Sequence, residues 1–296
     1  MATTLNISSL PDYVEQHRDE LFVSSTVGAK SLDYVEIMPN VKYKDALNYL
    51  DSEVEIREAS CGWNPGGSDT FAQRYIEVKT VEIEKEWCYL DFSKKYMNYQ
   101  LNFEAGRETL PFEEKLAESN TNKVKEAVEV GIWQGISGIT DGWLAEAVSE
   151  SAATADFASG MTVSEKINAV VAALSSKMLS KGVNIFLSET DFRNYVLEAN
   201  ASCCGNRPVI DAASAEITFA GDSRIKLVSV LGLENTGKIV AATPDALVYG
   251  TDIEGSETVY RLWFDEKEQK FMFRVLFNMG TAIKFVDEVV LGADAE

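Results

Sequence analysis

The chain is poor in the side chains that most often carry chemistry in proteins. Its 296 residues include one histidine, His17, and four cysteines. No C-x-x-C pair occurs among them, so the usual zinc spacings are missing. Cys203 and Cys204 are adjacent, which is a poor geometry for a disulfide between them. We therefore expect free thiols, as in a reducing cytosol.

Long apolar runs and an excess of basic charge are missing as well. The longest apolar stretches, such as Ile167–Leu174, fall far short of the roughly 20 residues that a membrane-spanning helix needs. The N-terminal residues show no basic region and no apolar core, so we expect no signal peptide. Lys and Arg number 27 against 47 Asp and Glu, a formal charge of −20, which argues against general nucleic-acid binding.

One stretch imitates a nucleotide-binding loop. Residues 232–238 follow the pattern G-x-x-x-x-G-K after an expected strand. A P-loop needs Ser or Thr next, to hold magnesium, and then a helix whose N-terminus faces the phosphates. Here Ile239 follows, Pro244 interrupts soon after, and Glu234 would place a carboxylate against phosphate. A hairpin turn that uses Gly237 is the better interpretation.

Other catalytic arrangements are equally incomplete. A Cys–His nucleophile pair would need His17 beside Cys203 or Cys204, across most of the chain. We predict no catalytic, cofactor-binding or metal-binding residues, and an enzyme with an unrecognised site stays open as an alternative. The composition is sufficient for a hydrophobic core, because 46% of the residues are hydrophobic and 10% aromatic. The length of 296 residues is enough for one large domain or two of ordinary size.

The most informative pattern is a β-ribbon with nothing of its own to pack on. Residues 52–58 and 73–87 alternate polar and apolar, and the loop 61–69 between them contains Gly and Pro, as in a hairpin. An isolated two-stranded hairpin is marginal in water, so its apolar face needs a partner surface, which we expect to be another copy of the chain. The predicted inter-subunit contact residues are Trp63, Ile76, Val78, Val81 and Ile83.

Two details of the ribbon shape these predicted contacts. Trp63, beside Gly, Asn and Pro, is predicted to be an anchor at the tip, and the alternative is that it folds back on its own ribbon. Ile76 and Val78 share one face, whereas from Val81 onward the apolar residues fall on the other face. We interpret this slip of phase as a bulge that bends the ribbon over a neighbour.

Helical patterns follow the ribbon. Pro111, with acidic residues after it, indicates the start of a helix over residues 112–135, whose apolar residues recur at multiples of four. Residues 136–160 are rich in small residues and indicate a mobile connection. A capping box over residues 162–165 then begins a further helix, which Gly182 ends.

Strands dominate the rest of the chain. A short strand at 183–187 lies between helical patterns, an order typical of α/β structure, and the following helix covers 192–199. The other expected strands are 225–231 and 239–242, followed by a three-stranded meander of 258–264, 271–277 and 281–286 with turns at 265–270 and 278–280.

The order of these parts resembles that of a tailed-bacteriophage major capsid protein of the Hong Kong 97 type. The ribbon resembles the family's extension loop (E-loop), residues 111–135 its spine helix, and residues 183–195 the start of its axial domain. Residues 239–252, IVAATPDALVYGTD, resemble the family's "vaatpdnlvyGtD" stretch, and residues 271–291 resemble its closing strands. The resemblance covers nearly the whole chain. It rests on the order of the elements and on short stretches of similar sequence, and no set of catalytic or ligand-binding residues supports it.

The resemblance implies an α+β fold of the Hong Kong 97 capsid type, divided into four parts. These are an N-terminal arm (1–40), an extended β-ribbon or E-loop (41–92), a peripheral domain (93–162 and 256–296, with the spine helix at 112–135) and an axial domain (163–255).

The resemblance also implies a function, that of a non-catalytic major capsid protein. Such a chain self-assembles, as a homo-oligomer of pentamers and hexamers, into the icosahedral shell of a virion. The shell encloses DNA without sequence-specific binding, needs no cofactor or membrane, and is made in the host bacterial cytoplasm. A portal is expected, and the roughly 40 residues before the ribbon suggest a separate scaffold protein and no cleavage. The shell of an encapsulin-like nanocompartment that holds a cargo enzyme is the alternative with the same fold.

Overall fold

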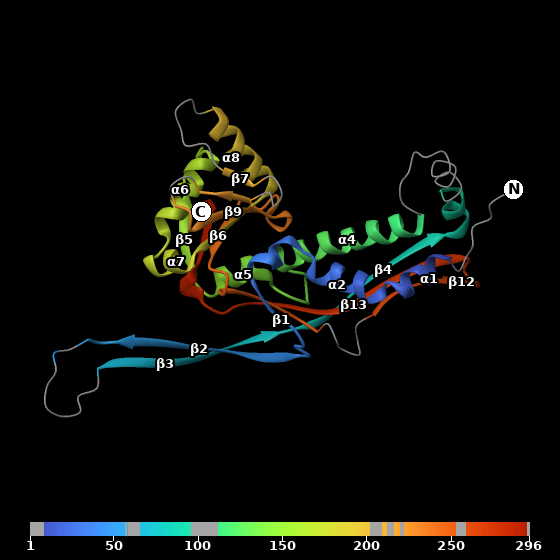
Figure 1. Ribbon diagram of the computed structural model, residues 1–296, viewed down its shortest axis with the longest axis horizontal. Helices are drawn as coiled ribbons and strands as arrows, with labels where there is room; N and C mark the ends of the chain where they lie inside the picture. Colours follow the sequence, from blue (N-terminus) through green and yellow to red (C-terminus); the bar gives the residue numbers. More distant parts are fainter. Residues whose placement is uncertain are drawn as a thin grey trace.

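Two β-sheets and a long helix form the body of the molecule, and a two-stranded ribbon projects from one end (Figure 1). Figure 1 shows the computed structural model of the chain. The structure describes residues 9–56, 58, 66–95, 112–201, 209–211, 216–219, 222–252 and 259–294.

The first sheet is long, and one strand holds it together. Its order is β1-β11-β13-β12, and β4 also pairs with β13. β13 is antiparallel to β4, β11 and β12, so it bonds to three strands along its length. The strands are β1 (Glu36–Met38), β4 (Lys79–Cys88), β11 (Leu247–Thr251), β12 (Val259–Asp265) and β13 (Lys270–Ile283).

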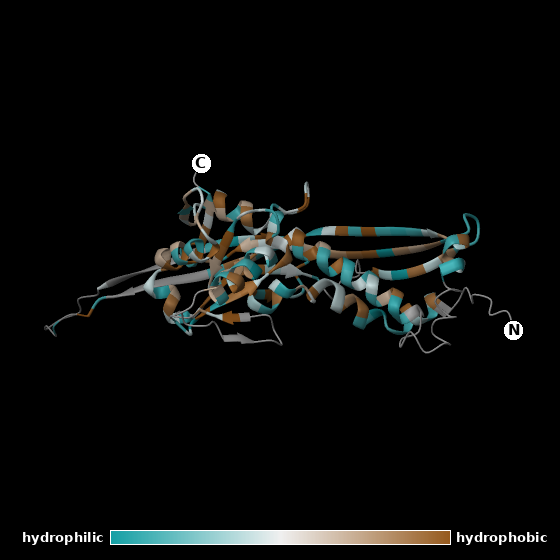
Figure 2. Ribbon diagram, turned by 90° about the horizontal axis from the view of Figure 1, so that it is seen from above, coloured by the Kyte–Doolittle hydropathy of each residue, from teal (hydrophilic) through white to brown (hydrophobic). Residues whose placement is uncertain are grey.

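This sheet buries one face. Along the first half of β13, the side chains of Phe271, Phe273, Val275 and Phe277 are buried, and those between them are more exposed or polar. The same alternation of hydrophobic and hydrophilic residues is visible along the long strands in Figure 2. Period-two burial of this kind is typical of an antiparallel sheet with one face against a core.

The second sheet has seven strands and mixed directions. Its order is β5-β14-β10-β6-β9-β8-β7, in which β5 runs parallel to β14 and β6 parallel to β9. All residues of β6 and β10 are buried, as expected for central strands. The strands are β5 (Ala153–Phe157), β6 (Val183–Leu187), β7 (Val209–Asp211), β8 (Glu216–Thr218), β9 (Ile225–Ser229), β10 (Ile239–Ala242) and β14 (Val289–Asp294).

The long helix α4 (Phe112–Gln134) runs along the first sheet (Figure 1) and confirms the predicted spine helix. Its last turns carry Trp133, which is fully buried against Trp143 and Phe186, with ring centroids 5.0 Å away in both cases. Edge-on contacts between such rings add about 1 kcal/mol beyond the burial of their area. The aromatic cluster therefore fixes the end of the helix to the second sheet and to α5.

Residues 89–95 are helical, and the other helices are shorter than α4. They are α1 (Ser9–Gln16), α2 (Arg18–Val27), α5 (Gly142–Ser149), α6 (Val163–Ala173), α7 (Ser176–Lys181) and α8 (Glu189–Ala201), with short 3-10 turns η1 (Lys30–Tyr34), η2 (Leu231–Leu233) and η3 (Val286–Glu288).

The predicted arm is folded onto the body over its described residues. Helices α1 and α2 pack on α4 and β12, and β1 pairs parallel with β11. Leu10, Val14, Phe22 and Leu32 are buried in the main core. A segment that looked like an arm in the sequence thus contributes part of the hydrophobic core.

The predicted ribbon is half right. β2 (Lys44–Val54) and β3 (Gly67–Glu77) form a two-stranded sheet, so the hairpin is confirmed. Its first strand was predicted too late in the chain, at 52–58, because β2 begins at Lys44 and ends at Val54. The second predicted strand was too long, because β4 leaves the ribbon after Val78 and pairs with β13. The slip of phase was real, but its cause is this change of partner: residues before it face the ribbon base and residues after it face the main core.

Three other expectations are corrected by the structure. Residues 136–160 are not a mobile connection, because they contain α5 and β5. The expected helix after the confirmed capping box of Thr162 is broken at Leu174, and Ser175 caps the next one, α7, which ends at Gly182 as predicted. The turn expected at 278–280 does not exist, because β13 runs through it.

Sheet membership cuts across the predicted domain boundaries. The second sheet takes β5 and β14 from the segments assigned to the peripheral domain, whereas β11, assigned to the axial domain, belongs to the first sheet. β4, assigned to the ribbon, also belongs to the first sheet. Each of the two sheets thus contains strands from segments that were assigned to different parts.

Candidate assembly surfaces

The ribbon of β2 and β3 is the most prominent surface feature (Figure 1). Its two strands are antiparallel in one unbroken register, from Lys44 opposite Glu77 to Val54 opposite Gly67. Eleven residues per strand at about 3.3 Å each extend the ribbon by roughly 35 Å. Among the described residues, each strand of the ribbon pairs only with the other, so both outer edges carry unpaired backbone groups.

Cross-strand polar contacts stiffen the ribbon near its base. Lys44 Nζ lies 2.6 Å from Glu77 Oε1 and 4.6 Å from the centre of the Tyr75 ring. The hydrogen bond from Lys44 holds the pKa of the Glu77 carboxyl below its usual range. Gln73 Nε2 donates to Asn48 Oδ1 at 3.0 Å. These contacts are exposed, so they set the register more than they stabilise the fold.

A small apolar cluster fixes the ribbon to the body. It comprises buried residues from the ribbon base and from β11 and β13: Val41, Leu47, Ile76, Val78, Val248 and Ala282. Two glycines allow the close approach. A Cβ on Gly280 would lie 2.1 Å from the carbonyl oxygen of Glu77, and one on Gly250 would lie 2.8 Å from Cδ1 of Ile76.

Four of the five predicted contact residues lie against their own chain, and their contact with another subunit stays a prediction. Ile76, Val78 and Val81 are buried inside their own chain, and Ile83 packs against the main core. The reason is that β4 belongs to the first sheet, whose core-facing residues have the same alternation as a ribbon. Trp63 lies outside the described residues.

A polar groove of about 510 Å³ separates the ribbon base from α5. It is bridged at its rim, where Arg74 Nη1 lies 3.0 Å from Glu150 Oε2 and donates to the Ile283 carbonyl at 3.3 Å. Lys79 Nζ donates to the Gly138 carbonyl at 3.2 Å. These contacts set the direction in which the ribbon leaves the body. No pattern in the sequence predicted them.

Glu146 of α5 lies in the same groove. Burial raises its pKa to about 7, and the neighbouring acids Asp141 and Glu150 act in the same direction. The Thr281 hydroxyl donates to Glu146 Oε1 at 2.6 Å, which opposes the shift. Glu146 sits in the segment that the sequence suggested was mobile, so it was not a candidate there.

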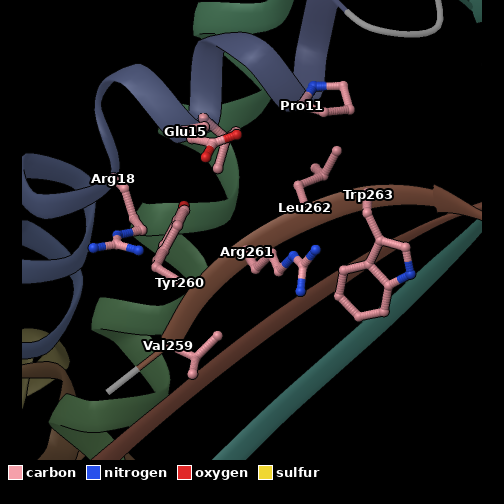
Figure 3. Close-up of a pocket in the computed structure, with 9 residues that line it drawn as sticks. Pro11, Glu15, Arg18, Val259, Tyr260, Arg261, Leu262 and Trp263 are labelled. Atoms are coloured by element: carbon pink, nitrogen blue, oxygen red, sulfur yellow. The ribbon is translucent and has the colours of Figure 1, made fainter. Parts of the chain in front are cut away.

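A second groove, of about 440 Å³, lies at the other end of the molecule between α1 and β12 (Figures 1 and 3). Five consecutive residues of β12, Val259 to Trp263, form one wall. The other wall combines Pro11 and Val14 with Glu15 and Arg18, one charge of each sign. Arg261 is exposed, and its guanidinium lies 5.7 Å from the ring centre of Trp263.

The stretch that imitates a P-loop has structural roles. It continues into strand β10 where nucleotide binding would need a helix. A Cβ on Gly232 would lie 2.2 Å from Cδ1 of Trp133, so this glycine lets η2 pack on α4. The Glu234 carboxylate accepts bonds from the hydroxyl and the backbone N–H of Thr190 at the start of α8.

Gly237 does have a positive φ of 65°, as a turn requires, but the turn is not a hairpin. The strands that it connects, β9 and β10, lie on either side of β6.

Other candidate chemistry finds no support in the described part of the chain. No group of three or more metal-ligating side chains comes together there. His17 packs against Tyr13 at 4.6 Å, whereas Cys203 and Cys204 lie outside the described residues. Within the described ranges, every helix is too short or too polar to traverse a bilayer.

The fold of the chain is similar to that of several solved structures. A chain of the Satellite phage P4 procapsid aligns with a TM-score of 0.59 at 8% identity, covering 100% of this chain and 93% of that chain. The chain has the phage-capsid fold. The capsid of an empty GTA particle aligns with a TM-score of 0.58 at 11% identity over 90% of each chain. The virus-like particle from Pyrococcus furiosus gives 0.56 at 11% identity, covering 95% of this chain and 100% of that chain.

These likenesses confirm the predicted α+β fold of the Hong Kong 97 type over nearly the whole chain. No protein-family model matches the sequence, and no curated protein matches it either. Identities of 8–11% mean that the likeness is one of architecture.

Proposed function

We propose that this chain is a major capsid protein, a non-catalytic structural subunit that assembles into a closed icosahedral shell around a phage genome. The observation that carries the proposal is the ribbon of β2 and β3, which projects from a chain of phage-capsid fold and has both edges unpaired among the described residues. A two-stranded sheet is marginal in water, and only the base of this ribbon packs on its own body, so the rest of the ribbon gains its stability from a surface of another copy.

The charge of the chain fits a container for DNA. With a net charge of −20, a shell wall repels phosphates and does not hold the genome tightly. The same charge opposes contact between copies, so assembly must overcome like-charge repulsion. Because added salt screens exposed charges, the yield of shells should rise with ionic strength. Pentamers and hexamers, a separate scaffold protein and a portal are parts of the same proposal.

The direct test is assembly of the purified chain. We would measure its size by size-exclusion chromatography and image it by negative-stain microscopy, from low to high salt, with and without a co-expressed scaffold. Closed particles are expected, and a stable monomer under every condition would contradict the proposal. A chain without residues 59–70 is the matched variant: its body should fold, and its particle yield should fall.

One alternative has a structural likeness behind it, because a virus-like particle is among the similar structures. A nanocompartment shell of the same fold would enclose a protein cargo. Nuclease-treated particles purified from the native source separate the two functions: protected DNA supports the capsid, and a co-purified enzyme without DNA supports the nanocompartment.

A further inference from the structure

Strand β12 is an edge of the first sheet with space beside it. In the part of the chain that the structure describes, it pairs with β13 alone. Its seven residues, Val259–Asp265, include neither glycine nor proline, both of which weaken the pairing of strands. The groove of about 440 Å³ separates this edge from α1 (Figure 3), so another strand can approach the backbone N–H and C=O groups of β12.

The sequence of the strand is complementary to its own reverse. Residues 261–265 read Arg-Leu-Trp-Phe-Asp, with a cation at one end, a carboxylate at the other and Trp263 in the centre. An antiparallel pair of such strands centred on Trp263 places Arg261 of each strand opposite Asp265 of the other. The leucine of each strand then lies opposite the phenylalanine of the other. Each cross-strand pair therefore joins opposite charges or two apolar side chains.

Both charges can accept a partner. Arg261 and Asp265 lie on the face of the sheet opposite to that of the buried Leu262. Arg261 stands opposite Arg274 of β13, whose charge is already paired with two glutamates of β4. Among the described residues, no carboxylate lies within ion-pair distance of Arg261. Asp265 receives two backbone N–H groups of the following turn on Oδ1, at 2.8 and 3.3 Å, which leaves Oδ2 for a cation.

We propose that β12 of one copy pairs with β12 of a second copy, antiparallel and about a two-fold axis at Trp263. Such a contact is isologous, so both copies contribute the same residues and form two identical ion pairs between Arg261 and Asp265. The sheet then continues from one copy into the other, in the order β4-β13-β12-β12-β13-β4. The inference rests on the proposed function in one respect: an icosahedral shell has two-fold axes, which give this contact a place in the shell.

Charge reversal tests the register. Arg261→Asp and Asp265→Arg should each raise the dissociation constant of the dimer about tenfold, because both ion pairs become contacts between like charges. Sedimentation of the unassembled chains measures this constant. An equimolar mixture of the two variants should dimerise as tightly as the unchanged chain, because unlike charges then meet at both positions. Rescue by mixing requires that Arg261 of one copy faces Asp265 of the other.

Two controls accompany these variants. Arg193→Asp reverses an exposed charge of α8 and should leave the dimer unchanged. Asp265→Asn keeps the oxygen that accepts the turn N–H groups and removes only the charge, so it should still weaken the dimer, by about threefold. Thermal unfolding of each variant verifies that it folds.

A disulfide gives a second readout that does not depend on charge. Residues directly opposite each other in antiparallel strands have Cα atoms about 4.5–5.5 Å apart, within reach of a disulfide. Trp263→Cys, on the two-fold axis, should therefore give a covalent dimer on a non-reducing gel after mild oxidation. Val259→Cys is the matched control, because the two copies of this residue lie roughly 26 Å apart in the same register. The unchanged chain gives the background from the native cysteines.

Two results would overturn the inference. One is that mixing the two charge variants does not restore the dimer although both fold. The other is that Trp263→Cys cross-links no more than Val259→Cys, in unassembled chains and in shells alike. Shells of the unchanged chain still form in these cases. Failure of the shell function has a different signature, in which the cross-linked dimer forms but no closed particle appears at any salt concentration.

Discussion

Gly280 touches the backbone of Glu77 at the point where the ribbon leaves the body. A Cβ on Gly280 would lie 2.1 Å from the Glu77 carbonyl oxygen, and the obstructing atom is backbone, which cannot turn aside. This contact brings β13 close to the end of β3, where the strand changes its partner from β2 to β13. The direction of the ribbon thus depends on a glycine in the middle of a strand.

We expect Gly280→Ala to destabilise the chain by about 1–3 kcal/mol, because the added methyl group forces the two backbones apart. Urea unfolding of the unassembled chain measures this change. Gly131→Ala is the control: its methyl group would meet side-chain atoms of Ile136 and Met279, which can move, and no distant backbone atom, and alanine favours the helix there. Equal unfolding midpoints for Gly280→Ala and the unchanged chain would contradict the close contact.

A second prediction concerns the polar link between the arm and the spine helix. Ser31 donates to Glu129 through both its hydroxyl and its backbone N–H, and Trp133 Nε1 donates to the Ser31 hydroxyl at 2.7 Å. All three residues are buried. Ser31→Ala leaves polar groups of Glu129 and Trp133 without this partner, at a cost of about 1–3 kcal/mol each.

The measurement is limited proteolysis together with chemical unfolding. Ser31→Ala should lower the stability and release the N-terminal residues to cleavage before the rest of the chain. Ser149→Ala, at an exposed serine of α5, should change neither. Cleavage that begins elsewhere in Ser31→Ala would show that the link does not hold the arm.

Local patterns of the sequence predicted the parts of the fold that depend on near neighbours. The helix at 112–134, the capping box of Thr162 and the strand at 183–187 all formed as expected. What failed were features decided by distant partners. Gly280 looked like a turn because glycine is common there, whereas its role is the approach of Glu77 from a distant part of the chain.

The assembly surfaces were predictable only in outline. Alternation identified a ribbon, but alternation is the same in a projecting hairpin and in a half-buried sheet, so Val81 and Ile83 were assigned to the wrong one. The hydrogen bond between Ser31 and Glu129 joins residues 98 positions apart, and no pattern near either residue predicts it.

Glu146 gives the third prediction, a dependence of stability on pH. Its pKa of about 7 in the folded chain lies above the ordinary value of 4.5, so the folded state binds more protons between these values. The contribution of Glu146 therefore favours folding at low pH and is lost as the pH rises from about 4.5 to 7. The difference is about 3 kcal/mol at most, at 1.36 kcal/mol per pH unit.

Glu146→Gln removes this titration. Stability profiles from pH 4 to 8 should be flatter for the variant, which should be the more stable chain above pH 7. Glu189→Gln is the control, because Glu189 is an exposed carboxyl of α8 that pairs with Arg193 and does not line the groove. If the stability profile of Glu146→Gln has the same slope as that of the unchanged chain, Glu146 is not the group that causes the pH dependence.

Glu288 carries the last prediction, with the opposite sign. Although burial alone would raise its pKa, hydrogen bonds from Lys181 and Thr243 hold the pKa below its usual range. Lys181 Nζ lies 2.7 and 2.8 Å from the two carboxylate oxygens, and the Thr243 hydroxyl donates at 2.7 Å. The stability that these bonds provide is present above the ordinary pKa of the carboxyl and is lost as the pH falls through the lower folded value.

Lys181→Met leaves the buried carboxylate with Lys177 as its nearest cation, at 3.7 Å. We expect a loss of about 3 kcal/mol at pH 7, near the lower limit for breaking a buried pair, because Lys177 compensates in part. Lys177→Met should cost much less, since it removes only the longer and more exposed contact. The loss in Lys181→Met should shrink as the pH is lowered and Glu288 becomes protonated, because a neutral carboxyl no longer needs the cation. A loss that stays constant down to pH 3 would instead indicate that Lys181 acts through packing on Phe285, whose ring centre lies 4.9 Å from its Nζ.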